Sequence, residues 1–334
     1  MTAIRQKKGT FYMKIKAISQ AVALSLLLCS VGGTASAAST SQSLEVHPTK
    51  EMVQLVSNVV YAQVPDRGYV SKAMTMDLLV PCGEGPYPAI VYINGGGFIN
   101  ANKDGYIQQR LELAEHGYVV ASITYRVAPA STFPAPLEDV KSAIRYLRAH
   151  ADQFHIDSQH IGVMGGSAGG YLAAFAGTTS GTRQFDSGDN LEQTSDVQAV
   201  VDLYGVSDLT AIGADYGPDV QELHRSPAAT EALWINGSPV FGGKDGGIDA
   251  NPEGAAAANP ISYISEKTPP FLLMHGDADT VVSPSQTEIL RATLAQHNVE
   301  AQRYVVKGAG HGGALWIQPE IMKLIIDFFD AHLK

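Results

Sequence analysis

The sequence predicts an α/β protein with a mostly parallel central sheet, helices on both faces, and an antiparallel hairpin at the N-terminal edge. Apolar runs of strand length alternate with segments of helical period from residue 89 to the end of the chain. Such continuously apolar runs indicate strands buried on both faces, as in parallel sheets that helices cover. The 334 residues, of which 45% are hydrophobic and 17% charged, can hold one large α/β domain or two small ones.

The N-terminal hairpin is predicted from two β-rich segments, 56–64 and 73–80, with a Pro-Asp-Arg-Gly turn between them. Met74, Met76 and Leu78 alternate with less apolar neighbours in the second segment. The remaining strands are expected at 89–93, 118–125, 161–164, 197–204, 271–275 and 302–306. Helices are expected at 106–116, 137–149, 284–297 and 319–332.

The N-terminus resembles an export signal. Lys14 and Lys16 precede an apolar run over 17–31, and small residues follow up to Ala38. This order is typical of a secretory signal peptide cleaved after about Ala37, so we expect export to a periplasm or the medium. A transmembrane anchor is disfavoured because the run is short for a bilayer, and no stable membrane span is expected after cleavage. The predicted organisation is a signal at 1–37, a flexible leader at 38–54 and a single domain at 55–334.

Removal of residues 1–37 would leave 18 basic against 33 acidic residues, a formal charge of −15. Nucleic acid is therefore not an expected partner, because phosphate binding needs clustered Lys and Arg. Of the two cysteines, Cys29 lies in the signal, which leaves Cys82 and no intramolecular disulfide. The fold is expected to depend on its hydrophobic core alone.

The stretch 206–259 interrupts the alternation of strands and helices with Gly-rich, polar and acidic pieces and an alanine run. Irregular insertions of this length are usually functional or mobile. We expect a small lid-like insertion over the functional site, with a peripheral excursion as the alternative.

The strand at 161–164 ends in Gly165-Gly166-Ser167-Ala168-Gly169, and a small, apolar, helix-permissive segment follows. A strand that enters a helix through Gly-x-Ser-x-Gly is the nucleophile elbow of an α/β-hydrolase. The turn forces the serine into strained backbone angles, and a bulky residue at Gly165 or Gly169 would clash. Ser167 is the candidate nucleophile.

An activated serine also needs a base and an acid that orients the base. The strand 271–275 runs into Gly276-Asp277-Ala278-Asp279, and carboxylates there lie at the edge of the sheet where ligands bind. His311 lies between glycines after the last strand and is the candidate base. Spacing does not decide between Asp277 and Asp279. A metal site of His275 with these carboxylates is the alternative, but no second cluster stands at matching spacing.

The loop after the strand 89–93 reads Asn94-Gly95-Gly96-Gly97-Phe98. Glycines allow backbone amides to approach a substrate carbonyl, so Gly96, Gly97 and Ala168 are the candidate oxyanion-hole donors. A phosphate-binding loop is disfavoured, since the Gly-Lys-Ser/Thr ending and the G-x-G-x-x-G spacing are both missing.

Together with Tyr125-Arg-Val-Ala-Pro129, these motifs resemble the α/β-hydrolase esterase/lipase group over roughly residues 56–334. Within that group the chain is most similar to hormone-sensitive-lipase-like carboxylesterases and to secreted acetylxylan and feruloyl esterases. The resemblance implies Asp279 as the triad acid, through the pattern His-Gly-x-x-Asp-x-x-Val. Family members usually carry His-Gly-Gly-Gly where Asn94 begins the loop here, and an asparagine can also hold that loop by hydrogen bonds.

The expected function is an exported serine hydrolase that cleaves small or carbohydrate-linked carboxylic esters through an acyl-serine intermediate, without a metal or cofactor. Ser167, Asp279 and His311 are its expected triad. The alternatives are a peptidase of the prolyl-oligopeptidase type, an arylformamidase-like amide hydrolase, and a binding protein that lacks catalysis.

Overall fold

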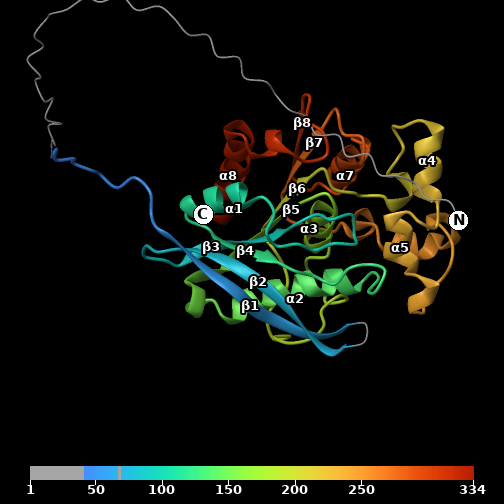
Figure 1. Ribbon diagram of the computed structural model, residues 1–334, viewed down its shortest axis with the longest axis horizontal. Coiled ribbons are helices and arrows are strands. Elements are labelled where there is room, and N and C mark those ends of the chain that lie inside the picture. Colours follow the sequence, from blue (N-terminus) through green and yellow to red (C-terminus); the bar gives the residue numbers. More distant parts are fainter. Residues whose placement is uncertain (1–40, 67–68) are drawn as a thin grey trace, which may run out of the picture. The chain divides into compact units, whose positions relative to one another are not determined.

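A single sheet of eight strands lies at the centre of the computed structural model, which describes residues 41–66 and 69–334 (Figure 1). The spatial order is β1-β2-β4-β3-β5-β6-β7-β8. β2 is antiparallel to both β1 and β4, and every later pair is parallel. The predicted fold class is therefore confirmed, including the antiparallel N-terminal edge. The strands are β1 Val53–Asp66, β2 Tyr69–Pro81, β3 Tyr87–Ile93, β4 Val119–Ile123, β5 Ile156–Gly166, β6 Ala199–Leu203, β7 Phe271–Gly276 and β8 Ala301–Val306.

The helices cover both faces of the sheet, which explains why β4, β6 and β7 are buried along their whole length. One hydrophobic cluster joins the sheet to α2, α3 and α7, and a second joins it to α1 and α8. Burying one large aliphatic side chain contributes about 1.5–3 kcal/mol, so these clusters supply most of the driving force for folding. The helices are α1 Ile107–Glu115, α2 Ala135–Ala149, α3 Ala168–Thr178, α7 Ser285–Gln296 and α8 Pro319–Leu333.

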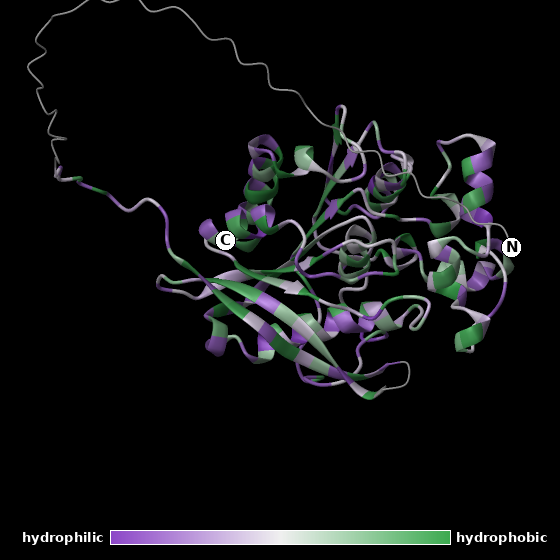
Figure 2. Ribbon diagram, in the orientation of Figure 1, coloured by the Kyte–Doolittle hydropathy of each residue, from purple (hydrophilic) through white to green (hydrophobic). Residues whose placement is uncertain are grey.

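The β1–β2 hairpin differs from the central strands because only one of its faces packs on the core. Hydrophobic and hydrophilic residues alternate along it in Figure 2. Met74, Met76 and Leu78 are buried, as their alternation in the sequence indicates. The pairing of Met76 with Ile123 continues the hairpin into the rest of the sheet.

The chain divides into two units between His47 and Pro48. The unit that starts at Pro48 holds every element named above. Its first contacts come before the predicted boundary at 55: Lys50 pairs with Glu115 at 2.5 Å, and the Met52 carbonyl accepts from the Cys82 amide. The predicted signal at 1–37 lies outside the described residues. Within 41–66 and 69–334, no helix combines the length and apolar character needed to cross a membrane.

The insertion at 206–259 has more regular structure than its composition indicates. It holds three short helices, α4 Pro218–Arg225, α5 Thr230–Asn236 and α6 Pro252–Ala257. Proline occupies the first turn of α4 and α6, where a missing N–H costs nothing, and Asn251 caps α6 by accepting from the Gly254 amide.

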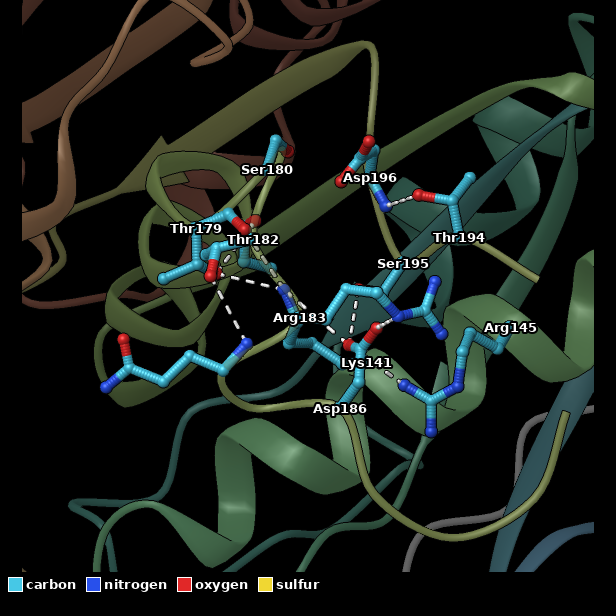
Figure 3. Close-up of polar contacts among 12 residues, drawn as sticks. Lys141, Arg145, Thr179, Ser180, Thr182, Arg183, Asp186, Thr194, Ser195 and Asp196 are labelled. Carbon is cyan, nitrogen blue, oxygen red and sulfur yellow. Dashed lines mark hydrogen bonds and ion pairs between the residues drawn. The ribbon is translucent and has the colours of Figure 1, made fainter. Parts of the chain in front are cut away.

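The long segment between α3 and β6 is held by a buried charged cluster (Figure 3). Lys141 and Arg145 of α2 are completely buried, with Asp186 of the segment as their counter-charge. Lys141 Nζ also donates to the carbonyl and hydroxyl oxygens of Thr179, each at 3.2 Å. The Ser195 hydroxyl donates to Asp186 at 2.6 Å, so this carboxylate connects the later part of the segment to α2, while Lys141 holds its beginning at Thr179.

Asp202 is a buried acid in the middle of the sheet, on β6. Its Oδ1 accepts from the Gly205 amide at 2.9 Å, whereas Oδ2 has no hydrogen-bond partner among the described residues. Burial raises the pKa of Asp202 to about 7. A carboxyl whose pKa is raised by folding favours the native state while it is protonated, and this contribution is lost as the pH rises through the folded pKa.

We therefore expect the free energy of unfolding of the wild-type protein to fall as the pH rises from about 4 to above 7, when it is compared with that of the Asp202→Asn variant. A shift of about three pKa units corresponds to about 4 kcal/mol in total. Urea denaturation of both proteins between pH 4 and 8.5 measures the difference. Parallel curves over this range would show that Asp202 is ionised at no cost.

Candidate active site

The strand-to-helix turn at Ser167 has the strained geometry that its glycines predict. Ser167 lies between β5 and α3 with φ 58° and ψ −126°, a region that non-glycine residues avoid. A Cβ added to Gly169 would overlap the carbonyl oxygen of Ile93, and one added to Gly165 would overlap the backbone of Gly169. These glycines let β3, β5 and α3 approach closely enough to hold the serine at the carboxyl edge of the sheet.

Three residues distant in the sequence form one hydrogen-bonded chain at this edge. His311 Nε2 lies 2.7 Å from Ser167 Oγ, and His311 Nδ1 lies 2.7 Å from Asp279 Oδ2. Asp279 follows β7, and His311 lies in the loop between β8 and α8. In this arrangement the imidazole can take the serine proton while the carboxylate holds the tautomer and stabilises the imidazolium.

Asp279 is held in its ionised form by its surroundings. Burial opposes ionisation, but hydrogen bonds from His275 and His311 and from the Val281 amide together hold the pKa of Asp279 well below its usual range. Its Oδ1 accepts from the amides of Val281 and Val282 at 2.8 and 3.0 Å. The carboxylate can therefore meet the imidazole as an anion at neutral pH.

Asp277, the other acid of the same turn, has a different place. It is exposed, and its Oδ1 accepts from the Gly308 amide at 2.6 Å. The structure thus places Asp279, and not Asp277, beside His311.

The metal alternative for His275 does not fit its surroundings. His275 is completely buried, with Nε2 3.0 Å from the Val282 carbonyl oxygen and Nδ1 3.2 Å from Thr287 Oγ1. Both ring nitrogens are thus engaged by protein groups. In the part of the chain that the structure describes, no group of three His, Cys, Asp or Glu side chains could hold a metal ion.

The glycine-rich loop after β3 lies against the serine. Gly96 and Gly97 line the same cavity as Ser167, whereas Ala168 is buried at the first position of α3 and does not line it. Among the described residues, no acceptor is hydrogen-bonded to the amides of these three residues. Free amides beside a nucleophile are the donors that an oxyanion requires.

Asn94 holds this loop, as its hydrogen-bonding capacity indicated. Its side-chain Nδ2 donates to Ser122 Oγ at 3.0 Å, and its main-chain carbonyl oxygen accepts from the Tyr125 hydroxyl at 2.8 Å. On the far side of the loop, Phe98 has a φ of 64°, and its ring packs on Tyr171 and Trp234. Trp234 belongs to α5, so the insertion supports the loop from behind.

The site opens into a cavity of about 430 Å³. Beyond Ser167, His311 and the glycine-rich loop, its walls are mainly phenol and amide side chains. These are Tyr92, Asn94, Asn100, Asn102, Tyr106 and Tyr204. No described residue of 206–259 lines it, and the lid-like role of the insertion stays a prediction.

Sequence reasoning did not identify Tyr204 and Tyr106 as site residues. Tyr204 directly follows β6 with a φ of 45°, and its ring lies edge-on to His311 with centroids 5.0 Å apart. Its hydroxyl donates to that of Tyr106 at 3.4 Å. The position of Tyr204 just after a parallel strand is the signal that could have identified it. Tyr106, which precedes α1, offered no such signal.

Comparison with known proteins identifies the family of this fold and site. Residues 76–294 match the BD-FAE family, a range that includes Ser167 and Asp279 and ends before His311. The chain belongs to the BD-FAE family. This agrees with the α/β-hydrolase esterase resemblance in the sequence.

Among curated proteins, this BD-FAE chain is 33% identical over 232 residues to esterase LipC of Mycobacterium tuberculosis, covering 68% of this chain and 53% of that protein. It is 31% identical over 203 residues to the probable carboxylic ester hydrolase LipM of the same organism, covering 60% and 43%. The chain thus spans about half the length of the curated relatives it matches.

Two solved structures share the fold over most of the BD-FAE chain. A truncated carbohydrate esterase from gut microbiota has a TM-score of 0.70 and 29% identity, covering 83% of this chain and 95% of that one. A bifunctional GH43-CE protein of Bacteroides eggerthii has a TM-score of 0.72 and 28% identity, covering 84% and 35%.

Proposed function

We propose that this protein is a serine-dependent carboxylic ester hydrolase. The observation that carries the proposal is the unbroken chain from Ser167 through His311 to Asp279, with both hydrogen bonds at 2.7 Å. The esterases among its relatives support the same reaction class.

In this reaction Ser167 Oγ attacks the ester carbonyl carbon while its proton passes to His311 Nε2. The carbonyl oxygen becomes an oxyanion, which the amides of Gly96, Gly97 and Ala168 stabilise. His311 then gives its proton to the leaving alcohol as the carbon–oxygen ester bond breaks, and an acyl-serine remains. Water, deprotonated by His311, releases the acid and restores Ser167.

We further propose that the substrates are short-chain acyl esters of hydroxyl-rich alcohols, such as acetylated carbohydrates. The cavity of about 430 Å³ leaves little room for a long acyl chain beside the bound part of the alcohol. The Tyr106 oxygen accepts from the Gly313 amide at 3.1 Å and from the Tyr204 hydroxyl at 3.4 Å. With both lone pairs occupied, its own proton has no acceptor among the described residues and can be donated to a substrate hydroxyl.

Replacement of the two aspartates tests the catalytic assignment. Asp279→Asn should lower kcat on p-nitrophenyl acetate by about 10⁴-fold, because an amide at this position favours the wrong imidazole tautomer. Asp277→Asn, the matched control, should keep most of the wild-type rate, since this side chain faces Gly308. The reverse order of the two losses would refute the assignment. Cleavage of N-formylkynurenine or an aminoacyl-proline anilide without ester cleavage would instead indicate an amidase or peptidase.

Replacement of one hydroxyl tests the substrate class. Tyr106→Phe should lower kcat/KM on acetylated xylo-oligosaccharides by up to about tenfold, the value of one hydrogen bond, while p-nitrophenyl acetate is unaffected. Tyr304→Phe on β8, remote from the cavity, is the control. Equal losses on both substrates would show that Tyr106 does not contact the alcohol.

A further inference from the structure

The triad acid has a second histidine against the same oxygen that His311 uses. His275 Nε2 lies 3.3 Å from Asp279 Oδ2, and both side chains are completely buried. Asp279 Oδ2 thus lies between two imidazoles, one that reaches Ser167 and one at the end of β7. The mechanism proposed above uses only the first of them.

The hydrogen bonds around His275 fix the direction in which its protons point. The Val282 carbonyl oxygen can only accept, so the nitrogen beside it, Nε2, carries a proton. Asp279 Oδ2 lies 3.3 Å from the same nitrogen, so this N–H is also within reach of the triad acid. A neutral His275 therefore has an unprotonated Nδ1, which needs a donor.

Thr287 of α7 is that donor, and its direction is set by an arginine. Arg303 Nε lies 3.0 Å from Thr287 Oγ1, and a guanidinium can only donate. The hydroxyl oxygen therefore accepts from Arg303, and its own proton points to His275 Nδ1 at 3.2 Å. The Pro284 carbonyl oxygen is the other acceptor near the Thr287 hydroxyl. It lies farther away, 3.4 Å from Thr287 Oγ1, and it also accepts from Arg303 Nη2.

We propose that Arg303, Thr287 and His275 form a buried relay that positions Asp279 for His311. Arg303 orients the Thr287 hydroxyl, Thr287 fixes the His275 tautomer, and His275 Nε2–H holds Asp279 Oδ2 and shares its charge with His311. The relay rests on the proposed function of Ser167, His311 and Asp279. His275 and Thr287 touch no substrate and are positioning residues.

Among the described residues, charged side chains outside the relay lie close to some of its members. Asp215, which accepts from Ser283 Oγ and the Ser285 amide, lies close enough to interact electrostatically with His275. Arg303 also pairs with Glu288 at 3.4 Å. A change at Thr287 alters none of these charges, so its effect on a pH profile reports the tautomer of His275.

The test is Thr287→Val, which keeps the shape of the side chain and removes the hydroxyl, with Thr287→Ser as the variant that restores it. With p-nitrophenyl acetate, Thr287→Val should lower kcat about 10- to 100-fold, the cost of a misplaced catalytic group, with KM nearly unchanged. The acidic limb of the kcat/KM profile should move to higher pH, because Asp279 then stabilises the imidazolium of His311 more strongly. Thr287→Ser should recover both values.

His275 supplies a second, independent pair. His275→Gln keeps an N–H donor near the position of Nε2, whereas His275→Leu removes it, so glutamine should retain more of kcat than leucine. Full activity in a folded Thr287→Val or His275→Leu protein would overturn the relay. Losses that follow thermal stability alone, with an unmoved pH profile, would also overturn it, since they indicate a purely structural role.

A readout without substrate separates this proposal from the proposed function. The downfield proton resonance of the His311–Asp279 hydrogen bond should shift in Thr287→Val and return in Thr287→Ser. A wild-type protein that cleaves no ester would refute the proposed function, and this resonance would still test the relay. An unshifted resonance would refute the relay alone.

Discussion

The close approach of three backbone segments at the serine turn is the constraint on which the site depends. The Ile93 carbonyl lies where a side chain on Gly169 would begin, and a side chain on Gly165 would overlap the backbone of Gly169. A tightly packed interior cannot relieve such an overlap without moving β3 or α3. The same contact places the loop after β3 beside Ser167, so the proposed nucleophile and the proposed oxyanion donors are held by one packing arrangement.

The other polar side chains of the site lie at the same edge because they follow neighbouring parallel strands. Asp279 follows β7 and Tyr204 follows β6, while His311 lies in the loop after β8. Because neighbouring strands in a parallel sheet end at the same edge, side chains more than a hundred residues apart meet within hydrogen-bond distance. The buried polar contacts of Asp279 make this meeting rigid, since each lost partner would leave a charge unsatisfied.

The fold and the candidate residues Ser167 and His311 could be predicted because each has a local signal. Apolar runs mark the strands, and the glycines around Ser167 and His311 mark backbone turns that few other residues permit. The choice of Asp279 over Asp277 could not be derived from spacing, since it depends on which carboxylate the amides of Val281 and Val282 bind. Tyr106 could not be predicted because its partners Tyr204 and Gly313 are distant in the sequence. The Arg303–Thr287–His275 relay joins three consecutive elements, and its contacts depend on how α7 packs against β7 and β8. The helices of the insertion are short, and their packing through Trp234 is a tertiary effect.

The covalent step at Ser167 can be measured directly by reacting the purified protein with a fluorophosphonate and mapping the modified peptide by mass spectrometry. A single adduct on Ser167 is expected, absent from Ser167→Ala and formed much more slowly in His311→Ala, because the imidazole takes the serine proton. An adduct on another residue, or ester hydrolysis that persists in a folded Ser167→Ala protein, would contradict the acyl-serine mechanism.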